Sequence, residues 1–144
     1  MREFLIALAE TLIGNKVFQI CGLFVVADTA FGCMRALKKG KFNSSFGIDG
    51  AIRKSTMLLS LVFLAIFDSA VKIDLSAAIP FEIGKIINLC KVGTAEFFGI
   101  LYIAYETVSI LKNLTLCGLP LKKVWDTVRR FLEQYTDELP DKEE

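Results

Sequence analysis

The sequence predicts an all-α membrane protein with three transmembrane helices and a C-terminal amphipathic helix, which assembles into oligomers. Of its 144 residues, 53% are hydrophobic, and the mean hydropathy of +0.51 is high for a soluble domain of this size. The charged residues are segregated, so that long apolar segments alternate with short charged ones. This segregation argues against a nucleic-acid-binding protein, whose basic residues would form a patch without long uncharged runs beside it.

Three segments have the length and composition of membrane spans. A spanning helix needs about 20 mainly apolar residues, and segments 17–34, 55–71 and 92–111 fit that requirement. Each is bracketed by basic residues, in chain order Lys16 and Arg35, Lys54 and Lys72, and Lys91 and Lys112. We therefore expect a membrane domain over residues 17–114.

Two shorter regions flank this domain. Residues 1–16 are apolar but carry Glu10 and Asn15, and they fit either a helix at the membrane interface or the first turns of a long tilted helix. In residues 115–144, one helical face carries Leu121, Val124, Trp125, Val128, Leu132 and Tyr135, and the opposite face carries Lys122, Lys123, Arg129 and Arg130. This pattern predicts a cytoplasmic amphipathic helix, lying on a membrane or against a neighbour, which is followed by an acidic tail.

A basic segment, residues 35–54, separates the first two spans and is called the basic hinge below. Gly47 and Gly50 stand among serines and an asparagine, which predicts turns and loops. The basic residues of the hinge are Arg35, Lys38, Lys39, Lys41, Arg53 and Lys54. The hinge and the region from 112 onward carry twelve basic residues, against five in the N-terminus and the second connector. Because basic loops favour the cytoplasmic side, we expect the N-terminus outside and the hinge and C-terminus inside.

Acidic residues interrupt every predicted span. A carboxylate near the centre of a span costs about 2.5–3.5 kcal/mol unless it finds a partner, water or a proton. Asp28 lies deepest, and Gly32 and Ala36 follow it at intervals of about one turn. Small residues at this spacing predict a face for close helix packing, with a polar centre. The alternative is that Asp28 pairs with Arg35 or extends its carboxylate toward the inner membrane surface.

The other acids lie in different settings. Asp68 and Glu96 are near the outer ends of their spans, where we expect interfacial water to solvate them. Glu106 shares a helical face with Tyr102, Ser109 and Asn113, a polar stripe that would line a helix contact or a wet channel.

Motifs for enzyme chemistry are missing from the sequence. There is no histidine, no glycine-rich phosphate loop and no nucleophile motif, and the four cysteines form no CxxC pair. We therefore expect no enzymatic activity, no cofactor and no metal site.

Two ordered blocks resemble phage holins, most closely the toxin-secretion or phage-lysis holin family. The first is Asp28-x-x-x-Gly32, a basic run, and Asn43-Ser44-Ser45-x-Gly47-x-x-Gly50-x-x-Arg53-Lys54. The second is Tyr105-Glu106-x-x-Ser109-Ile110-Leu111-x-Asn113, followed by Gly118-Leu119-Pro120. Together they extend over most of residues 22–125. Two features depart from the family pattern. Lys112 stands where the pattern leads us to expect an acid, and the tail is acidic where holin tails are usually basic.

The resemblance implies a protein of the bacterial cytoplasmic membrane that self-assembles and forms lesions. These would let a cell-wall-degrading endolysin or a toxin pass, and an antiholin is a possible partner. On this basis we expect Asp28 and Glu106 to be buried between protomers, where they would meet water or the hinge arginines. Two alternative functions remain open, a small ion channel or transporter subunit and an antiholin-type regulatory partner.

Overall fold

The computed structural model describes residues 2–40, 44–79, 83, 85 and 91–133. Its elements are the helices α1 (Arg2–Gly14), α2 (Lys16–Lys38), α3 (Ser44–Ala70), α5 (Thr94–Leu116) and α6 (Lys122–Glu133), with a short 3₁₀ helix η1 (Ser76–Ala78). No strand occurs in these residues. Three helical stretches are long and apolar enough to cross a membrane: Lys16–Lys38, Gly47–Ala70 and Thr94–Leu116. The predicted all-helical fold with three candidate spans is confirmed.

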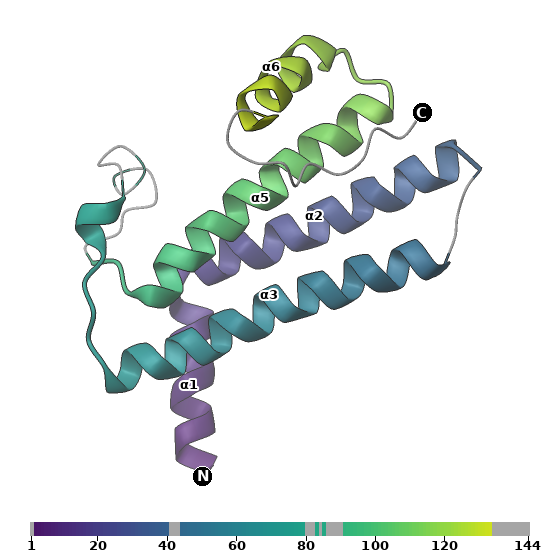
Figure 1. Cartoon of the computed structure of the whole chain (residues 1–144). Helices are drawn as coiled ribbons and strands as arrows, with labels where there is room; N and C mark the ends of the chain where they lie inside the picture. The colour runs from purple at the N-terminus through teal and green to yellow at the C-terminus, as the bar shows by residue number, and fades with distance from the viewer. Residues whose placement is uncertain (1, 41–43, 80–82, 84, 86–90, 134–144) are drawn as a thin grey trace.

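Helices α2, α3 and α5 lie side by side as a bundle (Figure 1). The C-terminal ends of α2 and α5 lie at the same end of the bundle as the N-terminal end of α3. Helices α2 and α5 approach each other closely at Gly99, where a β-carbon would lie 2.5 Å from Cγ1 of Val17. This glycine therefore allows the two helices to approach, as small residues do between membrane helices.

The core of the bundle is narrow. Its buried apolar side chains include Val17, Cys21 and Val25 from α2 and Met57 and Leu61 from α3. Large apolar side chains point outward along the same helices, with Leu23 and Val26 both 65% exposed and Phe63 64% exposed. In a bilayer these outward faces meet lipid or a neighbouring protein, so their exposure is expected of a membrane bundle.

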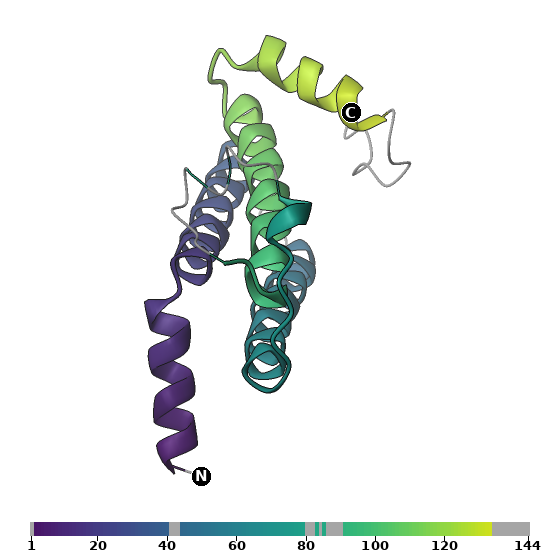
Figure 2. The same ribbon diagram turned by 90° about the vertical axis from the view of Figure 1, so that its left-hand side faces the viewer.

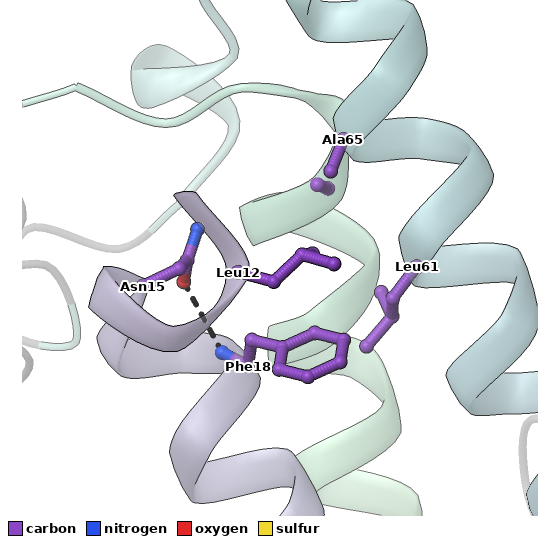
Figure 3. A pocket seen from close by; sticks show the side chains of 6 residues that line it. Leu12, Asn15, Phe18, Leu61 and Ala65 are labelled. Atoms are coloured by element: carbon purple, nitrogen blue, oxygen red, sulfur yellow. Dashed lines mark hydrogen bonds between the residues drawn. The ribbon is translucent and has the colours of Figure 1, made fainter. Parts of the chain in front are cut away.

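Helix α1 is separate from the first span. Oδ1 of Asn15 accepts a hydrogen bond from the backbone N–H of Phe18 at 3.1 Å and thereby caps the start of α2. Here α1 departs from α2 at a large angle (Figure 1). Leu12 and Phe18 border a small hollow with Leu61 of α3 at this junction (Figure 3). Residues 2–14 therefore do not continue the first span, and their position at a membrane interface stays a prediction.

The prediction of loop structure across the basic hinge was wrong for most of its length. Helix α2 continues to Lys38 and α3 already begins at Ser44, so both Gly47 and Gly50 are helical. A glycine costs about 1 kcal/mol in a helix, but an unpaired backbone group in a membrane costs several. Helical hydrogen bonding therefore outweighs the local preference for turns. Lys41 lies outside the described residues.

The connection between α3 and α5 is described only in part. The backbone N–H of Leu75 donates to the carbonyl of Val92 at 2.8 Å, which holds the start of the connector against the start of α5. Most of residues 80–90, the residues from 134 onward and with them the acidic tail lie outside the described residues.

The other end of the bundle leads from α5 into α6. Nζ of Lys38 donates to the carbonyl of Cys117 at 2.6 Å, which joins the C-terminal ends of α2 and α5. Gly118 then adopts a φ of +100°, a conformation that glycine favours, and the chain turns. Figure 2 shows α6 beyond this end of the bundle, at a large angle to α5.

Candidate functional site

A buried group of charged and polar side chains, called the ion cluster here, joins the three spans inside the bundle. It consists of Asp28 on α2, Lys54 on α3, and Glu106 and Asn113 on α5. Nζ of Lys54 lies 2.7 Å from Oδ2 of Asp28 and 2.6 Å from Oε2 of Glu106. Asp28 therefore pairs with a lysine of α3 and not with Arg35 of its own helix.

Asn113 completes the contact between α2 and α5. Its Nδ2 donates to Oδ1 of Asp28 at 2.8 Å. A β-carbon on Gly32, one turn beyond Asp28, would lie 3.7 Å from the same nitrogen. Asp28 and Gly32 therefore face α5 of the same chain. A role for Asp28, Gly32 and Ala36 as an assembly face between protomers stays a prediction.

The ion cluster contains two acidic side chains and one basic side chain. Asp28, Lys54 and Glu106 are 4%, 9% and 0% exposed, so two carboxyl groups share one amino group away from solvent. Oε1 of Glu106 has no hydrogen-bond partner among the described residues. A buried charge is stable only when it is paired and hydrogen-bonded. Lys54 is thus the group on which the burial of both carboxylates depends.

A second polar group, called the cap cluster here, lies at the opposite end of α5 from α6. Asp68 on α3 accepts hydrogen bonds from the backbone N–H groups of Thr94 (3.1 Å) and Ala95 (2.8 Å) and from the Thr94 hydroxyl (2.6 Å). These are among the first N–H groups of α5, which have no partner within the helix and lie at the positive end of its dipole. Asp68 therefore caps α5, where water alone was expected to solvate it.

Glu96 extends the cap cluster to α2. Its Oε2 accepts from the backbone N–H of Gly93 at 2.8 Å, and its Oε1 accepts from Nδ2 of Asn15 at 2.6 Å. A β-carbon on Gly93 would lie 2.7 Å from Oδ2 of Asp68 and 2.8 Å from Oε2 of Glu96. A side chain at Gly93 would therefore displace one or both of these carboxylates.

Other predicted site residues lie apart from both clusters. Tyr102 shares a hydrogen bond of 2.9 Å with Ser60, and Ser109 is half-buried on α5. The guanidinium of Arg53 lies 5.4 Å from the centre of the Tyr105 ring, a cation–π contact. Of the remaining hinge residues, Lys38 and Lys39 are exposed and Arg35 is half-buried.

Lys54 is the site residue that sequence reasoning placed wrongly, as the cytoplasmic boundary of a span. A helix starting at Ser44 carries Lys54 almost three turns into the bundle. The spacing between Ser44 and Lys54 could have indicated this position, because an unbroken helix through the hinge brings the lysine to the depth of Asp28.

The site offers no set of groups for metal chemistry. No three His, Cys, Asp or Glu side chains lie close enough together to hold a metal ion in the part of the chain that the structure describes. The ion cluster instead can hold helices together, and its strength depends on keeping water and lipid away from three charged groups.

Comparison with known proteins assigns the chain to a family. Residues 7–137 match the model of the family described as the bacteriophage holin family. The chain is 44% identical over 123 residues to the holin-like protein TcdE of Clostridioides difficile, an alignment that covers 85% of this chain and 74% of the relative. No solved structure matches the chain.

Proposed function

This chain belongs to the bacteriophage holin family and acts as a holin, and from that premise we propose how it does so. Copies of the chain assemble in the bacterial cytoplasmic membrane into a lesion. Through this lesion a cell-wall-degrading endolysin, or a toxin, crosses the membrane. The family is not enzymatic, and we propose no enzymatic activity for this member.

The observation that carries the proposal is the filled interior of the single bundle. The ion cluster occupies the space between α2, α3 and α5, and Leu61, Val17 and Cys21 fill the neighbouring core. A folded protein could not pass through such a bundle. A passage for one must therefore have a wall built from several copies.

The attachment of α3 suggests how assembly begins. This helix contacts the α2–α5 pair through few buried apolar side chains, and its polar links are Lys54, Ser60 and Asp68. We propose that separating Lys54 from its two partners frees a charged face of each protomer. Such a face is costly in lipid but is stable beside a water-filled opening.

The proposed orientation places the N-terminus outside and the C-terminus inside. Five basic residues of the hinge and C-terminal side now belong to spanning helices, as does Lys16 on the other side, which leaves seven basic residues against four. The excess still favours a cytoplasmic hinge. Reporter fusions at each terminus, active on only one side of the membrane, test this orientation.

Timed lysis tests the proposed function. The chain is expressed in bacteria that also make a cytoplasmic endolysin, and membrane potential and endolysin release are followed together. A holin gives sudden release and lysis. Depolarisation with the endolysin retained would instead identify a channel, and harmless expression would fit an antiholin.

A substitution in the ion cluster sharpens this test. Asp28→Asn removes a charge that holds Lys54, so we expect the time of lysis to shift and the oligomer size to change. Asp49→Asn is the matched control, because Asp49 is exposed near the start of α3. Unchanged timing and unchanged oligomer size in the Asp28 variant would contradict the proposed role of the cluster.

A further inference from the structure

Helix α6 has the features of a helix that binds a membrane surface. Val124, Trp125 and Val128 lie on one face, and Lys123 and Arg130 lie on the opposite face. Apolar side chains are concentrated on one face of α6 more strongly than in the other described α-helices. The average hydrophobicity of α6 is lower than that of each spanning helix. This combination distinguishes interfacial helices from spanning ones.

The apolar face of α6 is only partly covered by the rest of the chain. Val124 is 52% exposed, Trp125 and Val128 are half-buried, and none of the described side chains of α6 is buried. The helix is held to the bundle by a short connection, because α5 ends at Leu116 and α6 begins at Lys122. The apolar face therefore needs an occupant that lies close to the end of a span.

Position and charge identify this occupant. Five residues of extended chain reach at most about 18 Å, so α6 stays near the bilayer surface that α5 leaves. Its large angle to α5 (Figure 2) is the orientation that a helix parallel to that surface requires. Residues 122–133 carry four basic and two acidic side chains, so the helix is positively charged. Basic side chains near a membrane surface are attracted to anionic lipid headgroups.

We infer that α6 binds the bilayer surface at the C-terminal end of α5, with its apolar face among the acyl chains and its basic residues at anionic lipid headgroups. A second copy of the chain is the competing occupant. This inference does not depend on lesion formation, so it can hold even if the proposed function fails.

The chain carries its own reporter for the test, because Trp125 is its single tryptophan. The full chain is reconstituted in vesicles of phosphatidylcholine alone and of phosphatidylcholine with phosphatidylglycerol. Quenching of Trp125 is measured with aqueous acrylamide and with lipids brominated at different depths. We expect quenching to be strongest with bromine near the headgroup end of the acyl chains. Acrylamide quenching should be severalfold weaker than for free tryptophan, and weakest with phosphatidylglycerol at low salt.

Matched substitutions separate the two occupants. Val124→Asp puts a charge on the apolar face and should increase acrylamide quenching severalfold, whereas Thr127→Asp on the polar face should leave it nearly unchanged. Lys123→Gln with Arg130→Gln should remove the effect of phosphatidylglycerol. Trp125 protected from acrylamide but insensitive to brominated lipid would show a protein contact and overturn the inference. Trp125 fully open to acrylamide in both vesicles would overturn it too.

Discussion

The ion cluster and the cap cluster both join helices through buried or half-buried acids, but they do so by different means. Asp68 and Glu96 in the cap cluster accept hydrogen bonds from backbone N–H groups and from Thr94 and Asn15, so no opposite charge is needed. The carboxylates of Asp28 and Glu106 depend on one ammonium group. The cap cluster should therefore lose strength gradually when it is altered, whereas the ion cluster should fail when Lys54 is lost.

The largest effect is expected for Lys54→Met. Removing one partner of a buried pair leaves an uncompensated charge and costs about 3–5 kcal/mol, and here two carboxylates would be left. Unfolding of the purified chain by sodium dodecyl sulfate, followed by circular dichroism in mixed micelles, measures the loss. Lys16→Met is the control, because Lys16 is exposed at the start of α2. Adding Asp28→Asn and Glu106→Gln to Lys54→Met should restore most of the stability, and failure of this rescue would contradict the charge argument.

Gly99→Ala tests the helix contact between the two clusters. The new methyl group would meet Cγ1 of Val17 at 2.5 Å, and such overpacking costs about 1–3 kcal/mol. Both clusters should weaken, because both join α2 to α5. Gly22→Ala is the control, since nothing lies within 4 Å of a β-carbon there. Adding Val17→Ala should relieve the strain, and a Gly99→Ala variant as stable as the control would show that α2 and α5 move apart freely.

Asp68→Ala tests the cap cluster alone. Loss of a capping side chain costs about 0.5–2 kcal/mol, and the same unfolding measurement should find a smaller loss than for Lys54→Met. Ser69→Ala serves as the control, since its hydroxyl bonds only the carbonyl of Ile66 in its own helix. A loss equal to that of Lys54→Met would remove the distinction between the two clusters.

Glu106→Gln is expected to change stability little. The amide oxygen can still accept from Lys54, and the cluster would then hold one carboxylate and one ammonium. We expect a change within about 0.5 kcal/mol, or a gain, in the same unfolding assay. A loss of several kcal/mol would show instead that both negative charges are needed.

The smallest effect is expected at Asp74, in the connector outside the spans. Oδ1 of Asp74 accepts hydrogen bonds from the backbone N–H (2.9 Å) and the hydroxyl (2.5 Å) of Ser76, and these hold the pKa of Asp74 below its ordinary value. A depressed folded-state pKa gives stability that is present above the unfolded-state pKa and is lost as pH falls through the folded-state value. Ser76→Ala should raise the pKa of Asp74 toward its ordinary value in an NMR titration. An unchanged pKa would mean that other groups depress it.

The spans and their acids were predictable because long apolar runs and costly charges are visible in the sequence. The partners of those acids were not. Asp68 contacts Thr94, 26 residues away, and no local pattern indicates that pairing. Lys54 was misplaced because Gly47, Gly50 and their polar neighbours favour turns in water. In the bundle, helical hydrogen bonding and the two carboxylates decide the structure instead.

The spacing of the ion cluster along the chain also sets an order for its synthesis. Asp28 and Lys54 are 26 residues apart, whereas Glu106 follows Lys54 by 52 residues. At about 5–20 residues per second, the ribosome adds Glu106 roughly 3–10 s after Lys54. During that interval Asp28 and Lys54 are present as one acid and one base, and α5 then brings the second acid. A partner for Asp28 is therefore made before the acid of α5.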